Sequence, residues 1–92
     1  MKKIAVIGAV LEDPKDCQQI FNDTIAQYSH IVRGRMGIPF EAEGVSVISI
    51  TVLGSLDEIN SLTGQLGRIP HVSVKTSISK KTLEDCHEKP TE

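Results

Sequence analysis

The sequence contains no tryptophan, and among its 92 residues it has only one tyrosine and two phenylalanines. Proteins that bind single-stranded nucleic acid stack bases on aromatic side chains, so this chain is poorly supplied for that task. It also lacks an excess of positive charge, because ten Lys and Arg residues are set against twelve Asp and Glu residues, giving a net charge of −2. Nucleic-acid binding depends on basic residues that neutralise phosphates, so we do not expect direct binding to DNA or RNA.

Long apolar segments are missing as well. The longest apolar run covers residues 4–11, whereas a membrane-spanning helix needs about 20 residues. The acidic pair Glu12-Asp13 follows this run at once, so we expect neither a signal peptide nor a membrane contact. The two cysteines, Cys17 and Cys86, are too few for a disulfide scaffold. They predict a reduced, cytoplasmic protein.

Catalytic motifs are absent from the sequence. It has no Gly-x-Ser-x-Gly elbow and no phosphate-binding loop. Its adjacent carboxylates, Glu12-Asp13 and Asp57-Glu58, stand where helices are expected to begin, which favours a capping role. A third pair, Glu84-Asp85, lies in a polar C-terminal segment. We therefore expect that the protein is not an enzyme.

The spacing of apolar residues predicts six elements in the order βαββαβ. The expected strands are residues 2–11, 31–38, 45–53 and 71–79. Two right-handed βα crossovers then give an α+β, ferredoxin-like fold, with a four-stranded antiparallel sheet of order 4-1-3-2 and both helices on one face. Residues 80–92 are strongly polar and are expected to form a disordered tail, so the domain is predicted to span residues 1–79.

The first helix is expected to follow Asp13, a suitable N-cap residue, with Pro14 at its first position. It is expected to end near Ser29 or His30. Residues at helical spacing predict its buried stripe. That stripe comprises Cys17, Ile20, Phe21, Ile25 and Tyr28.

The second helix has a predicted start and end. Ser55 and Glu58 have the spacing of a capping box, and Gly67 is expected to be a left-handed C-cap. Gly64 lies within the helix and is expected to mark close packing on the sheet or on a neighbouring subunit. The predicted buried stripe comprises Leu56, Ile59, Leu62 and Leu66.

Three short motifs stand out: Arg35-Met36-Gly37-Ile38-Pro39, Leu62-Thr63-Gly64-Gln65-Leu66-Gly67 and Val72-Ser73-Val74-Lys75-Thr76. They resemble the small proteins named iron-only hydrogenase system regulators, and the resemblance covers roughly residues 3–79. That family is similar to ACT domains and to the C-terminal domain of nickel-responsive repressors, which are βαββαβ modules that oligomerise and sense small ligands. The resemblance therefore implies an ACT-like fold.

The resemblance also implies a function. The protein would regulate the iron-only hydrogenase system, at transcription or maturation, as a homodimer or homotetramer with a small ligand between subunits. It identifies neither the ligand nor a cofactor. The turn at residues 12–15 lacks the glycine common in ligand-binding ACT domains, and residues 31–38 carry arginines where nickel-responsive repressors have histidines. The alternative is a ligand-free module that docks on a DNA-binding or maturation protein.

Strand alternation predicts which side chains lie on the side of the sheet away from the helices. The expected set is Ala5, Ile7, Ala9, Arg33, Arg35, Val45, Val47, Ser49, Thr51, His71, Ser73 and Lys75. An exposed surface with an apolar centre usually contacts a partner, so we expect a homo-oligomer interface. Alternatively, the two arginines hold a small anion or are ordinary surface residues. The candidate ligand or interface residues are Arg33, Arg35, Asp13 and Lys75.

The spacing of the cysteine and histidine residues gives little support for a metal site. Cys17 lies on the apolar stripe of the first helix and is expected to be a core thiol. Cys86 and His87 are adjacent in the tail, and no second pair gives zinc-site spacing. We therefore expect no metal site, and the best-placed candidate ligands are His30 and His71.

Overall fold

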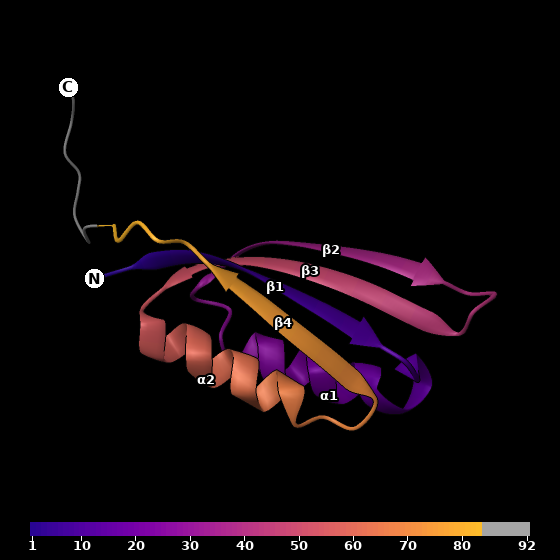
Figure 1. Ribbon diagram of the computed structural model, residues 1–92. Helices are drawn as coiled ribbons and strands as arrows, with labels where there is room; N and C mark the ends of the chain where they lie inside the picture. Colours follow the sequence, from indigo (N-terminus) through magenta and orange to yellow (C-terminus); the bar gives the residue numbers. More distant parts are fainter. Residues whose placement is uncertain (84–92) are drawn as a thin grey trace.

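Six elements follow one another in the order that the sequence predicts. The computed structural model describes residues 1–83. Its elements are β1 (Lys3–Leu11), α1 (Pro14–Ala26), β2 (Val32–Phe40), β3 (Val45–Gly54), α2 (Leu56–Gly67) and β4 (Val72–Ile78). They form one sheet and a layer of two helices that covers one side of it (Figure 1).

The sheet has the predicted topology. The strand order is β2-β3-β1-β4, and every neighbouring pair is antiparallel. This is the order 4-1-3-2 named from the other edge, so the ferredoxin-like α+β fold is confirmed. β1 and β3 occupy the centre, while β2 and β4 are the two edges.

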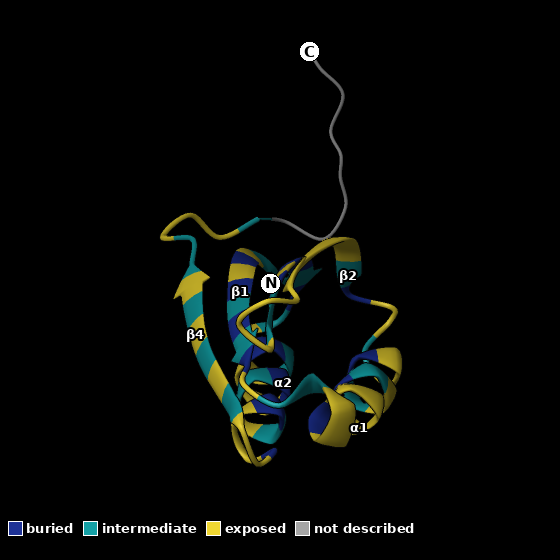
Figure 2. Cartoon of the chain, turned by 90° about the vertical axis from the view of Figure 1, so that its right-hand side faces the viewer, coloured by how far each residue is buried: buried dark blue, intermediate teal, exposed yellow. Residues whose placement is uncertain are grey.

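The core lies between the sheet and the helices. More buried and less buried residues alternate along β1 and β4 (Figure 2), whereas β2 is exposed over nearly its whole length. None of the fully buried side chains within residues 1–83 is polar or charged. The largest of them include Ile7, Leu11, Phe21, Ile50, Ile59, Leu62 and Leu66. Each such side chain contributes about 1.5–3 kcal/mol to folding through removal of apolar surface from water.

The first helix is shorter than predicted. α1 ends at Ala26, and residues 27–31 form turns instead of continuing to Ser29 or His30. Asp13 stands at the N-cap position, but its side chain accepts no capping hydrogen bond. Its backbone oxygen accepts from the amides of Asp16 and Cys17 instead. Ile20 was predicted to be buried, yet it is 51% exposed, because it lies on the flank of α1 beside the buried stripe of Cys17, Phe21 and Ile25.

The second helix begins as predicted and ends differently. Ser55 and Glu58 form the reciprocal capping box, each side chain bonding to the other's backbone amide. Gly67 is the last helical residue and is not left-handed, so the C-cap prediction is wrong. A Cβ on Gly64 would meet nothing within 4 Å, so this glycine marks no close packing within residues 1–83. Leu56 is exposed and does not join the buried stripe.

The predicted face assignment of β1 is wrong. Ala5, Ile7 and Ala9 are buried under the helices, and Ile4 and Val6 lie on the opposite side of the sheet. Both sets of alternate residues in this central strand are apolar, so hydrophobicity alone could not distinguish the two faces.

The predicted face assignment of β2 is also wrong, because the strand contains a bulge. Val32 pairs with Val52, but Gly34 already pairs with Thr51, so Arg33 is an extra residue between them. An extra residue reverses the alternation beyond it. Arg35 consequently lies on the helix side, while Met36, Ile38 and Phe40 lie on the other. Pro39 does not end the strand, since proline is tolerated in an edge strand.

Residues beyond Ser79, the predicted end of the domain, contact the start of the chain. Lys2 and Leu83 form an antiparallel bridge with two backbone hydrogen bonds, of 2.6 and 3.0 Å. The rest of the predicted tail, residues 84–92, lies outside the described residues. Within residues 1–83, neither helix has the length and apolar character needed to cross a bilayer.

Candidate functional site

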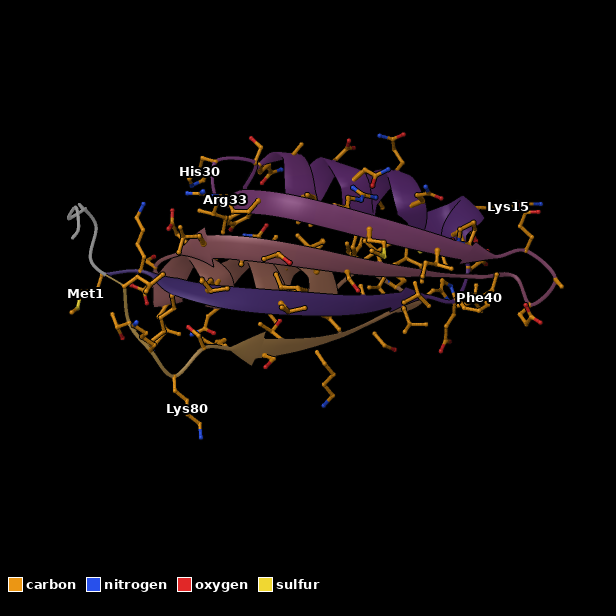
Figure 3. All side chains as sticks on the ribbon, turned by 90° about the horizontal axis from the view of Figure 1, so that it is seen from above. Met1, Lys15, His30, Arg33, Phe40 and Lys80 are labelled. Carbon is orange, nitrogen blue, oxygen red and sulfur yellow. The ribbon has the colours of Figure 1, made fainter. Side chains whose placement is uncertain are left out.

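One side of the sheet has no helix over it, and we call this surface the open face. Figure 3 looks onto it. The pairing registers and the burial pattern give its members. They are Ile4, Val6, Gly8 and Val10 of β1; Gly34, Met36, Ile38 and Phe40 of β2; Val45, Val47, Ser49, Thr51 and Leu53 of β3; and Ser73, Lys75 and Ser77 of β4.

The registers arrange these side chains in rows across the sheet. One row runs Ile38–Val47–Val10–Ser73, and the next runs Met36–Ser49–Gly8–Lys75. The bulkiest apolar residues therefore gather on β2, and small or hydroxyl residues gather on β4. Lys75 is the only charged side chain among the residues that make up the open face.

The apolar side chains of the open face are substantially exposed. Met36 is 64% exposed, Ile38 48% and Val6 47%. Scattered apolar residues are normal on a surface, but a contiguous group across three strands, β1, β2 and β3, is typical of a binding surface. The structure places on the open face, as predicted, Val45, Val47, Ser49, Thr51, Ser73 and Lys75.

A hollow lies on the helix side of the sheet, between the start of α1 and the β2–β3 hairpin. We call it the hairpin groove. Its larger part has a volume of about 490 Å³, with Pro14, Pro39, Phe40 and Val45 among the residues that line it. A smaller part of about 260 Å³ extends along β2 toward Arg35 and shares Pro39 and Ser46 with the larger one. Lys15 and Phe40 lie at the same end of the molecule (Figure 3).

The hairpin groove combines apolar walls with charges of both signs. Asp13, Lys15 and Glu41 line its larger part, and Arg35 lines the smaller one. Apolar walls with a few polar groups are typical of small-molecule sites. Because Phe40 and Val45 also belong to the open face, the groove opens at the margin of that surface.

The structure separates the four predicted site residues. Lys75 lies on the open face as expected. Arg33 is exposed at the bulge. Arg35 points to the helix side, where its Nη2 donates to Asn22 Oδ1 at 2.7 Å and its guanidinium lies 5.9 Å from the centre of the Phe21 ring. The expected pair of arginines on one face is therefore not formed.

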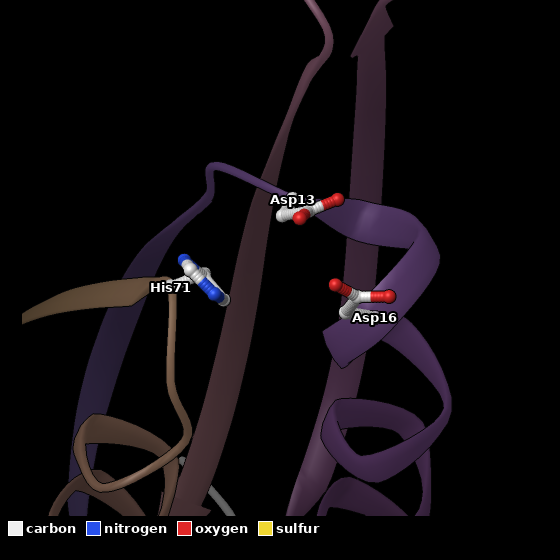
Figure 4. A group of neighbouring side chains, drawn as sticks. All are labelled: Asp13, Asp16 and His71. Atoms are coloured by element: carbon white, nitrogen blue, oxygen red, sulfur yellow. The ribbon is translucent and has the colours of Figure 1, made fainter.

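Asp13 lies in a different group, at the end of the sheet nearest the start of α1. Asp13, Asp16 and His71 each offer a ligand atom, and these atoms all lie within 4.8 Å of one another. Figure 4 shows the two carboxylates on the first turn of α1 and the imidazole on the turn before β4. His71 was predicted to lie on the open face; instead it occupies this turn with a φ of 70°. We call these three residues the end cluster.

His30 and Cys17 have structural partners. His30 Nε2 lies 2.9 Å from Glu58 Oε2, and the His30 ring stacks on Tyr28. Hydrogen bonds from the Ser55 backbone amide and from His30 lower the pKa of Glu58. Cys17 is a free, buried thiol, and burial raises its pKa, so it is not an activated nucleophile.

Sequence reasoning missed the end cluster because its members come from two distant turns. Asp13 was predicted to be an N-cap and a candidate ligand residue, and His71 was predicted to lie on a strand face and to be a candidate metal ligand, but the two were not brought together. One signal could have helped: antiparallel pairing of β1 with β4 places the end of β1 beside the start of β4. The backbone hydrogen bond from Glu12 N to His71 O, 2.8 Å long, joins these two turns.

Known proteins resemble this chain in both sequence and fold. The TM1266-like family, described as "Iron-only hydrogenase system regulator, putative", matches residues 3–76. The structure of the uncharacterized protein TM1266 from Thermotoga maritima is similar with a TM-score of 0.83 and 29% sequence identity. The match covers 87% of this chain and 100% of that one. No curated protein matches the sequence.

Proposed function

Because this chain belongs to the TM1266-like family of iron-only hydrogenase system regulators, we propose that it is a regulatory protein of that system and not an enzyme. It acts in transcription or maturation through the pairing of two copies over the open face. The observation that carries this proposal is the contiguous exposed apolar surface on one side of the sheet. A free buried thiol at Cys17 fits a protein of the reducing cytoplasm.

The open face is suited to a second copy of itself. In a symmetric pair, a two-fold axis parallel to the strands would place β2 of one copy over β4 of the other, and β3 over β1. Bulky Met36 and Ile38 would then meet the small Ser73 and Ser77 and the aliphatic stem of Lys75. Large-over-small contact of this kind lets two sheets pack at about 10 Å.

The area of the open face is sufficient. Four strands spaced about 4.8 Å apart give a width of about 19 Å, and four rows about 6.8 Å apart give a length of about 27 Å. Each copy therefore offers roughly 500 Å² of flat surface, and a pair buries roughly 1,000 Å² or more. That is the lower limit for a specific protein–protein interface.

The hairpin groove connects assembly to a ligand. Because Phe40 and Val45 line the groove and also belong to the open face, a small molecule bound there would fix two side chains of the pairing surface. A ligand shifts an assembly equilibrium only when it binds one state more tightly. Fixing these two side chains in the paired arrangement would supply that difference, so the groove is the proposed sensory site.

The test is the mass in solution, measured by light scattering behind size exclusion over a dilution series. The full chain is compared with Ile38→Lys. Ile38 is 48% exposed in the single copy, so pairing buries about half of a contribution of about 1.5–3 kcal/mol. Two symmetric positions lose about 1.5–3 kcal/mol together, which raises the dissociation constant by about tenfold to 150-fold.

Ile20→Lys is the matched control. Ile20 is 51% exposed, like Ile38, but it lies on the outer side of α1. We expect the wild type and Ile20→Lys to form dimers or tetramers, and Ile38→Lys to dissociate. A wild-type chain that is monomeric at all concentrations would refute pairing, and would favour a docking module whose open face is used by another protein.

A further inference from the structure

The end cluster brings together three side chains of the kinds that bind transition metals. Asp13 and Asp16 come from the first turn of α1, and His71 comes from the turn before β4 (Figure 4). Imidazole nitrogen and carboxylate oxygen are ligands of zinc, manganese and iron, at distances of about 2.0–2.2 Å. Ligand atoms at such distances lie about 3–4 Å apart, so separations within 4.8 Å close by small rotations of exposed side chains.

The side chains of the end cluster are not held by other polar groups within residues 1–83. None of them forms a side-chain hydrogen bond or ion pair with the described part of the chain. The carboxylate of Asp13 would ordinarily cap α1, but it accepts no bond from the helix amides. Two carboxylates thus lie close together without a basic partner, beside an imidazole from a segment distant in sequence.

Backbone hydrogen bonds hold in place both segments that carry the end cluster. Glu12 N donates to His71 O at 2.8 Å, which holds the turn before β4 against the start of α1. Asp16 N and Cys17 N donate to Asp13 O, which fixes the first turn of the helix. The positive end of the α1 dipole opposes a cation by only about 0.3–1 kcal/mol, which two nearby carboxylates more than offset.

We propose that the end cluster is a binding site for a divalent first-row transition metal, held by Asp13, Asp16 and His71. Three protein ligands leave coordination positions for water or for a ligand from outside the chain. The imidazole favours Mn²⁺, Fe²⁺ or Zn²⁺ over Mg²⁺, which prefers oxygen ligands. The site shares Asp13 with the hairpin groove, but it does not depend on the pairing of copies over the open face.

The first test is an NMR titration of the full chain with Mn²⁺ alone, whose unpaired electrons broaden nearby amide signals. We expect the signals of residues 12–17 and 70–73 to broaden at the lowest metal concentrations. A tenfold excess of Mg²⁺ should leave this pattern unchanged. Broadening that begins in residues 84–92, or that is uniform over the chain, would overturn the proposal.

The second test is calorimetric titration with Zn²⁺ of the wild type, His71→Asn and Asp16→Asn. Asparagine adopts positive φ more readily than most residues, so His71→Asn keeps the turn while removing the imidazole. Loss of a residue that only supports a metal ligand weakens metal binding by about 10-fold to 100-fold. Loss of the ligand itself should weaken Zn²⁺ binding by at least this much.

Asp57→Asn is the matched control for the calorimetry. Asp57 lies in the first turn of α2, as Asp16 does in α1, but it belongs to no group of metal-ligating side chains within residues 1–83. The Asp57→Asn variant should bind Zn²⁺ with wild-type affinity. If His71→Asn and Asp16→Asn, checked for folding by circular dichroism, also bind with wild-type affinity, the end cluster is not a metal site.

Discussion

Gly54 provides a sharp test of the packing between β3 and α2. A Cβ at this position would lie 2.9 Å from Ile31 Cγ2 and 3.0 Å from Glu58 Oε1. Gly54→Ala must therefore displace a buried isoleucine and the carboxylate that completes the α2 capping box. Overpacking costs about 1–3 kcal/mol, and loss of a helix cap costs about 1 kcal/mol. We expect the free energy of unfolding to fall by about 2–4 kcal/mol.

Gly64→Ala is the control with the opposite sign. Nothing lies within 4 Å of a Cβ at Gly64, and the residue is exposed in the middle of α2. Alanine favours a helix over glycine by about 1 kcal/mol. Each kcal/mol corresponds to about 4–8 °C in Tm for a domain of this size. The two substitutions should therefore move Tm in opposite directions, Gly54→Ala down by about 8–32 °C and Gly64→Ala up by about 4–8 °C.

The free energy of unfolding of both variants is measured by urea denaturation, and their Tm by thermal denaturation. Both are followed by circular dichroism at one protein concentration. The concentration is fixed because pairing of copies would itself raise the apparent stability. A Gly54→Ala variant as stable as the wild type would refute the close approach of Ile31 and Glu58 to β3. A destabilised Gly64→Ala would show that α2 packs against a surface outside residues 1–83 of one copy.

Two further predictions concern Glu58 and Arg35. The folded-state pKa of Glu58 lies below its ordinary value of 4.5, so its contribution to stability is present above that value. This contribution is lost as the pH falls through the folded-state pKa. Urea denaturation at a series of pH values should therefore show the wild type losing stability relative to Glu58→Gln, whose side-chain oxygen can still accept from the Ser55 amide. Arg35→Ala should leave the solution mass unchanged, because Arg35 lies on the helix side; dissociation would instead place it in the interface.

The order of elements and the sheet topology could be predicted because they depend on signals repeated over many residues. Apolar periodicity distinguished strands from helices, and Ser55 with Glu58 identified the start of α2. The β4 face followed from clean alternation of Val72, Val74, Thr76 and Ile78 with polar residues. These features need no knowledge of neighbouring segments.

The faces of β1 and β2 could not be predicted because each depends on a single event that leaves no periodic signal. In β1, both alternate sets are apolar, so only the position of the helices decides which set is buried. In β2, one extra residue at Arg33 reverses the pattern. The end cluster was missed for a related reason, since His71 reaches Asp13 and Asp16 only through the antiparallel pairing of β1 with β4.

The bulge at Arg33 decides which side chains of the edge strand β2 lie on the open face. Regular alternation of the same residues from Val32 onward would turn Met36 and Ile38 toward the helix side and Arg35 toward the open face. Deletion of Arg33 would remove the bulge but leave Gly34 opposite Thr51, so Met36 and Ile38 would stay on the open face. The bulge is therefore the place where β2 can lose one residue without exchanging its two faces.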